Sequence, residues 1–392
     1  KVMMKILLAD QLAPLVRFSL EKKDFSVLEE PSLKDDSLLK TLKDFQPEVL
    51  VVRSTKVNAE HIKQTPSLSL IIRAGAGINT IALDEASQMG VFVANCPGKN
   101  AIAVAELVFG HMLNLDRNIF ENIQDFRSGV WNKKKYSKAK GLYGRKLALL
   151  GLGSIGTEVL SRAKAFGLNI QVWSRSLTKE KAERLGVTYA ATPQDAAKGA
   201  DILSVHLPSN SNTKDLIDSS VLSVLNDGAF FINTSRGELV NEDALLTAIE
   251  MKGIRVGLDV FKKEPGSGEK TTSSVLSKNS DIYTTHHIGA STNQATESVG
   301  EAVLEIINTW KKEGLVLNCV NISKQTKAVC CLSVRHADKV GLLANILEHV
   351  RADGLNIQEM DNIIFQGGKA ACARIFLAGS PSPALLSNLE AN

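Results

Sequence analysis

Three short segments in the second half of the chain carry side chains that could handle a hydroxy acid. Arg236, in the run Asn-Thr-Ser-Arg-Gly, could grip a carboxylate with two parallel hydrogen bonds. His287 lies in the run Thr-His-His-Ile-Gly-Ala-Ser, and Glu264 ends the run Asp-Val-Phe-Lys-Lys-Glu before a proline. A histidine beside a carboxylate can take up and return a proton, because the carboxylate fixes its tautomer and raises its pKa.

A glycine-rich turn is the second sign of chemistry. It reads Gly-Leu-Gly-Ser-Ile-Gly, follows an apolar run at 146–150, opens a helix near Thr157, and precedes a second strand that ends at Trp173. Glycines permit a tight turn and close approach to a pyrophosphate, and the helix N-terminus offers free N–H groups. The sequence therefore predicts a dinucleotide site. The predicted contacts in the turn are Gly151, Gly153, Ser154, Ile155 and Gly156.

The pair Ser174-Arg175 bears on which nicotinamide cofactor binds. An acidic residue is usual at the end of this second strand, where it holds the ribose 2′-OH of NAD. Ser174 removes the charge that would repel a 2′-phosphate, and Arg175 supplies a cation to pair with one. We therefore expect NAD, with NADP left open. Further predicted cofactor contacts are His206, Thr234 and Asp259.

Alternating short apolar runs and helical stretches must position these groups. We expect strands at 6–9, 49–52, 69–72 and 91–94, with helices at 12–22, 36–43, 59–64 and 82–89. After a helical stretch at 101–126 we expect strands at 146–150, 170–173, 202–206, 229–233, 255–259 and 282–284, then a helix at 290–313. Apolar strands separated by helices indicate parallel sheets covered on both faces. In such sheets, ligands bind at the carboxyl ends of the strands.

The pattern changes after residue 325. We expect strands at 329–334, 355–364 and 370–377, with helices at 341–351 and 383–389. This β-α-β-β-α order fits a ferredoxin-like unit whose last strand would begin at residue 392. Before it, the stretch 265–281 is rich in Gly, Ser, Thr and Lys and is expected to be a surface loop.

The composition excludes several classes of protein. The 392 residues include 46 Lys and Arg against 42 Asp and Glu, and a net charge of +4 is too small for a broad nucleic-acid surface. No run approaches the roughly 18 apolar residues of a membrane span. The five cysteines contain no CxxC pair, so we expect reduced thiols, a cytoplasmic location and no metal site.

These motifs, in this order, resemble those of the D-2-hydroxyacid dehydrogenases. The resemblance implies an α/β fold with two doubly wound parallel-sheet domains, a split substrate-binding domain and an inserted Rossmann domain. The C-terminal stretches 332–343 and 354–357 resemble an ACT domain, a small α+β ferredoxin-like regulatory module. The expected boundaries are 1–99 with 289–323 for the substrate-binding domain, 100–288 for the Rossmann domain and 327–392 for the ACT domain.

The resemblance also implies roles for the catalytic candidates. His287 matches the acid/base histidine, Glu264 matches its carboxylate partner, and Arg236 matches the substrate-binding arginine. His286 departs from the family pattern, which commonly has proline there, and adjacent strand residues point to opposite faces. The implied reaction is hydride transfer from C2 of a D-2-hydroxy acid to a nicotinamide ring.

The first hundred residues are expected to bind the rest of the substrate. An arginine and a serine after the strand at 49–52 suit a phosphate, and a Gly-Ala-Gly turn can bind a carboxylate through its N–H groups. With the ACT-like module, the chain is similar to the branch of the family that oxidises 3-phospho-D-glycerate in L-serine biosynthesis. The predicted substrate contacts are Arg53, Ser54, Gly75, Ala76, Gly77 and Asn100.

The ACT-like module implies an L-serine effector bound where two copies pair. The matching positions are His336, Asp338 and Asn356, although relatives often carry asparagine in place of Asp338. Trp131 and the lysines at 133–135 resemble a segment that docks on a neighbouring subunit. We therefore expect a homodimer or homotetramer.

Two other functions stay open. Within the enzymes, a glyoxylate or hydroxypyruvate reductase is favoured by Arg175 and opposed by Arg53 and the ACT-like tail. From a different class, relatives of this fold also serve as nucleotide-sensing, corepressor-like binding proteins. The complete set of catalytic candidates argues against that function.

Overall fold

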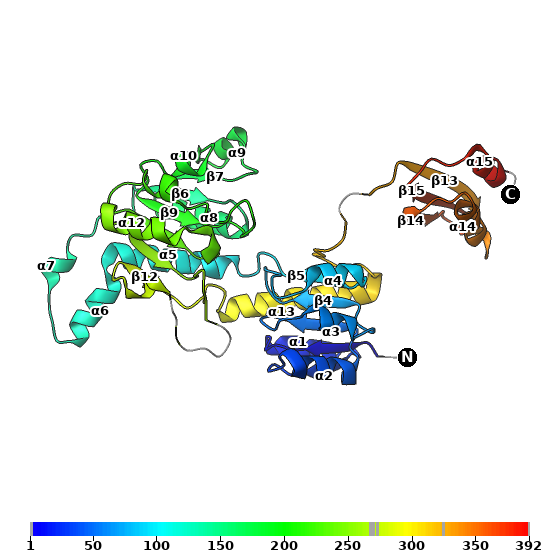
Figure 1. The fold of residues 1–392 in the computed structure, drawn as a ribbon, viewed down its shortest axis with the longest axis horizontal. Helices are drawn as coiled ribbons and strands as arrows, with labels where there is room; N and C mark the ends of the chain where they lie inside the picture. The colour runs from blue at the N-terminus through cyan, green and yellow to red at the C-terminus, as the bar shows by residue number, and fades with distance from the viewer. Residues whose placement is uncertain (1–2, 266–270, 272–273, 324–325, 391–392) are drawn as a thin grey trace. The chain divides into compact units, whose positions relative to one another are not determined.

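The computed structural model describes residues 3–265, 271, 274–323 and 326–390 (Figure 1). The chain folds into two compact units, 1–321 and 322–392. Within the described ranges, no helix is long and apolar enough to cross a membrane. The finer division of the first unit into substrate-binding and Rossmann domains stays a prediction.

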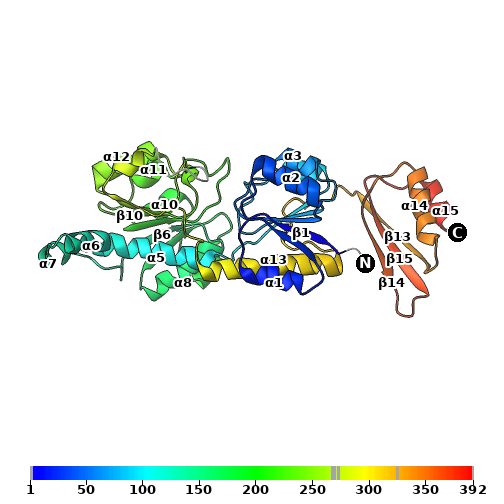
Figure 2. The same ribbon diagram turned by 90° about the horizontal axis from the view of Figure 1, so that it is seen from below.

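A five-stranded parallel sheet with helices on both faces forms from the first hundred residues. Its strands are β1 (Lys5–Leu8), β2 (Ser26–Glu29), β3 (Val49–Val52), β4 (Leu70–Arg73) and β5 (Phe92–Asn95), in the order β2-β1-β3-β4-β5. Its helices are α1 (Pro14–Glu21), α2 (Asp35–Phe45), α3 (Ala59–Lys63), α4 (Leu83–Gln88) and, from far along the chain, α13 (Asn293–Glu313). α13 packs beside α1 (Figure 2), and every residue of β3 is buried because both faces are covered.

A second parallel sheet follows the long helix α5 (Ala101–Arg117), which packs on it. Its strands are β6 (Lys146–Leu150), β7 (Asn169–Trp173), β8 (Thr188–Tyr189), β9 (Ile202–Val205), β10 (Phe230–Asn233), β11 (Arg255–Leu258) and β12 (Ile282–Thr284). Their order is β12-β11-β10-β9-β6-β7-β8, with a separate apolar core on each face. The covering helices are α8 (Ser154–Ala165), α9 (Lys179–Arg184), α10 (Pro193–Ala197), α11 (Ser219–Leu222) and α12 (Glu242–Lys252), with short 3-10 turns η1 (Gly237–Leu239) and η2 (Val275–Lys278).

The second unit is a three-stranded antiparallel sheet with two helices. Its elements are β13 (Cys330–Ala337), α14 (Leu342–Ala352), β14 (Ile357–Ile364), β15 (Ala370–Leu377) and α15 (Pro383–Glu390), with strand order β13-β15-β14. Every second residue of β15 is buried, and Ala373, Ile375 and Leu377 belong to the core shared with the helices. This alternation is what a sheet covered on one face requires.

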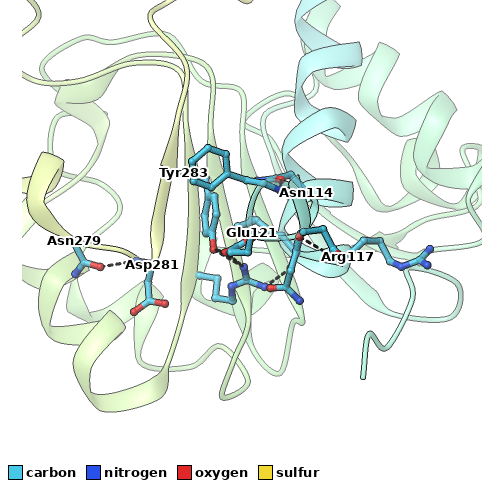
Figure 3. Close-up of polar contacts among 11 residues, drawn as sticks. Asn114, Arg117, Glu121, Asn279, Asp281 and Tyr283 are labelled. Atoms are coloured by element: carbon cyan, nitrogen blue, oxygen red, sulfur yellow. Dashed lines mark hydrogen bonds and ion pairs between the residues drawn. The ribbon is translucent and has the colours of Figure 1, made fainter. Parts of the chain in front are cut away.

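A polar network holds the short helix α6 (Ile119–Arg127) against the edge of the second sheet. α5 ends at Arg117, and the left-handed backbone of the next residue, Asn118 (φ 50°), redirects the chain. The carboxylate of Glu121 accepts a hydrogen bond from the hydroxyl of Tyr283 on β12 (Figure 3). Its Oε1 also lies 3.6 Å from Nη2 of Arg255 on β11. Asn114 caps the backbone just after the break. The network therefore fixes α6, and the following helix α7 (Lys133–Tyr136) is joined to α6 through the hydrogen bonds of Tyr136 and Lys135 to Asp125.

The predicted fold class and the predicted β-α-β-β-α order are confirmed. The helical stretch predicted at 101–126 is interrupted, because Asn118 adopts a left-handed conformation. Two strands were not predicted, β2 and β8, and both lie at sheet edges, are short and lack a fully buried run. The predicted loop at 265–281 lies partly outside the described residues, and its described part contains η2.

Candidate active site

His287 and Glu264, the predicted acid/base pair, are hydrogen-bonded. They follow the neighbouring parallel strands β12 and β11, and Nδ1 of His287 lies 2.7 Å from Oε2 of Glu264. The other carboxylate oxygen accepts the N–H of Phe261 at 3.1 Å, which fixes the orientation of the carboxylate. The His287 side chain is 48% exposed, so a small substrate can reach it.

This hydrogen bond shifts the pKa of both groups. It is the largest cause that raises the pKa of His287, and burial acts against it more weakly. Burial, the largest single cause, would raise the pKa of Glu264, but the hydrogen bond and charge of His287, with smaller effects of the Phe261 N–H and the Arg236 charge, together lower that pKa. The pair therefore stabilises an imidazolium beside a carboxylate, which is the state His287 reaches after it takes up a proton.

The backbone of His287 is held in an unusual conformation by Asp259. His287 has φ 53°, in the left-handed region that few side chains other than glycine adopt without strain. The carbonyl of Asp259 accepts the N–H of His287 at 2.8 Å, and its buried carboxylate accepts those of Ile288 (2.9 Å) and Gly289 (2.8 Å). The hydroxyl of Thr285 donates to the same carboxylate at 2.6 Å. Asp259 thus fixes the histidine loop, while its predicted contact with the cofactor stays a prediction.

Arg236 lies against the predicted carboxylate-binding turn. Its Nη1 donates to the carbonyl of Ser235 at 2.7 Å, and the Asn233 amide donates to the carbonyl of Arg236 at 2.9 Å. Its Nη2 approaches Gly77 so closely that a Cβ there would lie 3.0 Å away. The charge of Arg236 also acts on the pKa of His287. The structure therefore brings together the predicted arginine, the glycine turn and the acid/base pair.

Arg73, at the end of β4, is a cation that no motif in the sequence identifies. Its Nε is buried without a hydrogen-bond partner, and its guanidinium packs under Gly75, where a Cβ would lie 1.8 Å from Nη1. Burial, then the charges of Arg236 and Arg53, lower its pKa. Buried charges are normally paired, so a partly buried arginine beside two other arginines offers a place for an anion. A sequence signal was present, since Arg73 directly precedes the turn that begins with Ala74.

The other predicted substrate contacts lie at the ends of first-sheet strands. Arg53 lines a pocket of about 400 Å³ together with Gln11, Asn293 and Thr296. Ser54 is exposed beside it, and Ala76 is exposed in the glycine turn. Asn100 directly precedes α5, and its side chain makes no hydrogen bond that caps the helix.

The glycines of the GxGxxG turn serve two different purposes. A Cβ at Gly151 (φ 98°) would lie 2.3 Å from the carbonyl oxygen of His206, and one at Gly156 would lie 2.1 Å from that of Gly151. Packing within the protein therefore requires these two glycines. A Cβ at Gly153 would meet nothing within 4 Å. The open space beside Gly153 fits the close approach of a pyrophosphate. Ser154 and Ile155 then begin α8.

The remaining predicted cofactor residues differ in what they offer. The hydroxyl of Thr234, just after β10, is buried without a hydrogen-bond partner, and its predicted contact with the cofactor stays a prediction. The ring of His206 is hydrogen-bonded to Ser204 at 2.8 Å, and burial lowers its pKa to about 3, which leaves it neutral. Ser174 and the exposed Arg175 follow β7, whose last carbonyl accepts the N–H of Gly151 at 2.8 Å. They therefore lie beside the glycine turn.

The predicted effector residues are not brought together within one copy of the C-terminal unit. His336 on β13 pairs with Ala371 of β15, whereas Asn356 precedes Ile357, which pairs with Leu377 at the other end of the same strand. At the rise of a strand, these ends are about 20 Å apart. His336 is hydrogen-bonded to Asn362 instead, at 3.1 Å. Asp338, near His336, donates its N–H to the carbonyl of Lys369.

Comparison with known proteins defines the class to which this fold and site belong. Residues 109–289 match the family model described as "D-isomer specific 2-hydroxyacid dehydrogenase, NAD binding domain". The chain is 34% identical over 365 residues to a D-3-phosphoglycerate dehydrogenase of Methanocaldococcus jannaschii, covering 91% of this chain and 68% of that protein. The chain belongs to the D-isomer specific 2-hydroxyacid dehydrogenase family, and its second sheet carries the NAD binding domain.

Relatives within the family carry more than one name. A hydroxypyruvate reductase of Thermotoga maritima is 37% identical over 290 residues, covering 74% of this chain and 92% of that protein. An NAD+-bound 3-phosphoglycerate dehydrogenase of Entamoeba histolytica superposes with a TM-score of 0.68 at 26% identity, covering 82% of this chain and 99% of that one. The chain spans 52–68% of the length of several phosphoglycerate dehydrogenases that it matches.

Proposed function

We propose that this chain oxidises a D-2-hydroxy acid with a nicotinamide cofactor, and that the substrate is 3-phospho-D-glycerate. The product is then 3-phosphooxypyruvate, the first intermediate on a route to L-serine. The observation that carries the chemistry is the 2.7 Å hydrogen bond between His287 and Glu264, within the electrostatic reach of Arg236. The observation that supports a phosphorylated acid is the group of three arginines around the first-sheet strand ends.

Each catalytic side chain has a defined task. Nε2 of His287, which faces away from Glu264, takes the proton of the substrate hydroxyl, and Glu264 stabilises the imidazolium that forms. Arg236 binds the substrate carboxylate and polarises the carbonyl as it develops. When bound, the nicotinamide cofactor supplies the acceptor for the hydride that leaves C2. In the reverse direction His287 starts protonated and returns the proton.

The substrate carries two anionic groups, and the site offers cations for both. Arg236 and the N–H groups of Ala76 and Gly77 suit the carboxylate, whereas the N–H of Gly75 already donates to the carbonyl of Arg73 at 2.8 Å. Arg53 and Arg73 suit the phosphate, and the pocket beside Arg53 gives that end room. A substrate with both anionic groups offsets the repulsion among the arginines, which a substrate without a phosphate would do only in part.

A hydroxypyruvate or glyoxylate reductase is the second candidate, because a relative of which this chain covers 92% carries the name hydroxypyruvate reductase. An uncharged group at C3 would leave Arg53 and Arg73 without an anion, which argues against this candidate. A corepressor-like binding protein would not need the His287–Glu264 pair or the strained loop that presents it. We therefore place both candidates behind phosphoglycerate oxidation.

Cofactor choice and regulation extend the proposal. Ser174 and Arg175 support binding of NADP as well as NAD, because no acid at this strand end repels a 2′-phosphate. The separation of His336 from Asn356 means that an L-serine site built from both needs two paired copies. We therefore propose a homo-oligomer, with domains at 1–99 with 289–323, 100–288 and an ACT domain at 327–392. The cytoplasmic location stays a prediction.

Initial rates with a panel of substrates test the proposed function. The panel is 3-phospho-D-glycerate, 3-phosphooxypyruvate, hydroxypyruvate and glyoxylate, each with NAD(H) and NADP(H). We expect the phosphorylated pair to give the highest kcat/KM. Fast glyoxylate turnover with an inert phosphorylated pair would favour the reductase, and no turnover of any acid would favour a binding protein.

A further inference from the structure

A carboxylate that belongs to no predicted motif lies at the phosphate end of the candidate site. Asp10 follows β1, and β1 pairs in parallel with β3, so Asp10 and the residues after β3 share one edge of the sheet. A single oxygen of Asp10, Oδ2, accepts three successive backbone N–H groups: those of Arg53 (2.6 Å), Ser54 (3.0 Å) and Thr55 (2.9 Å).

Three consecutive N–H groups that converge on one point form an anion-binding nest. In this protein the anion in the nest is its own carboxylate. The N–H groups of Arg53 and Ser54 are therefore not available to a substrate. Within the segment after β3, recognition of a phosphate therefore falls to the side chain of Arg53, which lines the neighbouring pocket.

Asp10 is also the main tether of the segment that carries Arg53. Two longer bonds, 3.3 Å each, also hold the segment, and both run from the hydroxyl of Thr55, to the carbonyls of Ala9 and Leu33. The tether at Arg53 itself is the N–H bond to Asp10. The charge of Asp10 also acts on Arg73, so it reduces the repulsion between Arg73 and Arg53.

We propose that Asp10 is a positioning residue for phosphate recognition, which fills the nest after β3 and thereby directs Arg53 toward the substrate. The inference rests on the proposed function, because it assigns the substrate phosphate to Arg53. Asp10 does not touch the substrate. Its effect must therefore appear in the affinity for phosphorylated substrates and not in the rate of the chemical step.

The test is a comparison of KM and kcat in the full-length enzyme. In Asp10→Ala, we expect KM for 3-phospho-D-glycerate to rise about tenfold to a hundredfold, as expected for loss of a well-placed charged contact, while kcat stays within about twofold. KM for hydroxypyruvate, which has no phosphate, should not change. Asp10→Asn keeps an acceptor oxygen for the nest and should recover most of the affinity.

Asp201 supplies a matched control, because its carboxylate accepts the N–H of Lys146 at a strand start in the second sheet, away from the substrate edge. Asp201→Ala should leave the ratio of the two KM values unchanged. If Asp10→Ala does not fold, Asp10→Glu displaces the same oxygens and should raise the same KM selectively.

The outcomes separate this inference from the proposed function. Arg53→Ala should lose phosphate selectivity in the same way. Two results overturn the role of Asp10 and leave the proposed function intact. In the first, Arg53→Ala loses phosphate selectivity but Asp10→Ala does not. In the second, Asp10→Ala raises KM equally for 3-phospho-D-glycerate and hydroxypyruvate. A lower KM for 3-phospho-D-glycerate in Asp10→Ala would mean that the emptied nest binds phosphate, and this result also overturns the role of Asp10. A wild-type enzyme inert toward 3-phospho-D-glycerate rejects the proposed function and this inference together.

Discussion

Nδ1 of His287 lies 2.7 Å from Oε2 of Glu264, although the two residues are 23 positions apart in the sequence. They meet because β11 and β12 are parallel neighbours, which places the segments after both strands at the same edge of the sheet. The contact uses one ring nitrogen and leaves Nε2 without a hydrogen-bond partner among the described residues. A histidine held in this way can exchange a proton with a substrate at a fixed position.

The pH dependence of the reaction should follow this contact. Oxidation needs neutral His287, so its rate should increase as pH rises through the pKa of His287, which Glu264 holds above its ordinary value. In Glu264→Gln the carboxylate charge is lost and that pKa falls. We therefore expect the rising limb of kcat/KM for oxidation to move to lower pH, with a lower maximum. A limb at the same pH in both proteins would show that Glu264 does not control this titration.

The two kinds of glycine in the GxGxxG turn should respond differently to alanine. In Gly156→Ala the new Cβ would lie 2.1 Å from a backbone oxygen, so we expect a loss of about 1–3 kcal/mol in the free energy of unfolding. Gly153→Ala meets no protein atom and should fold normally, but it should weaken cofactor binding. Denaturant unfolding and NADH fluorescence titration measure the two effects. Normal cofactor affinity in Gly153→Ala would contradict the predicted position of the pyrophosphate.

Arg175 should contribute to binding of NADP alone. Arg175→Ala removes a cation that can pair with the 2′-phosphate, so kcat/KM with NADPH should fall about tenfold to a hundredfold. The value with NADH should change little. Ser174→Asp should act in the same direction, because the new charge repels the 2′-phosphate and can hold the ribose hydroxyls. Equal losses with both cofactors would assign Arg175 to a surface that both cofactors share.

Arg73 should matter for the substrate and not for the stability of the fold. Its Nε has no partner, and the charges of Arg236 and Arg53 act on it more strongly than that of Asp10, so Arg73→Gln removes a charge that is only partly compensated. We expect an unchanged or slightly higher denaturation midpoint, together with a KM for 3-phospho-D-glycerate raised by about tenfold or more. Arg17→Gln, which changes an exposed arginine paired with Glu21, is the control. Lower stability with an unchanged KM would make Arg73 a structural residue.

The sequence was sufficient to predict the parallel sheets and the residues at their strand ends. His287, Glu264 and Arg236 each follow an apolar strand, and parallel strands bring their carboxyl ends to one edge. The same reasoning predicted the glycine turn, since its strand and helix context is local in the sequence. These features depend on short-range patterns, which a single sequence contains.

Features that depend on distant segments were not predictable. The role of Arg73 comes from Arg236, which belongs to the other sheet of the unit. The nest around Asp10 depends on the pairing of β1 with β3, and the left-handed His287 depends on Asp259. The strand β2 was not predicted because it has no fully buried residue, and its place at the edge of the sheet, which permits this partial burial, is set by distant segments.

The central claim is that His287 is the acid/base group, and a pair of neighbouring histidine variants tests it most directly. The measurement is kcat for 3-phospho-D-glycerate oxidation in His287→Ala and in His286→Ala, with cofactor affinity determined for both. We expect kcat to fall about 10²–10⁴-fold in His287→Ala, as for loss of a general base, while cofactor affinity and the His286→Ala rate stay near wild type. Near-normal turnover in His287→Ala, or a comparable loss in His286→Ala alone, would contradict the assignment.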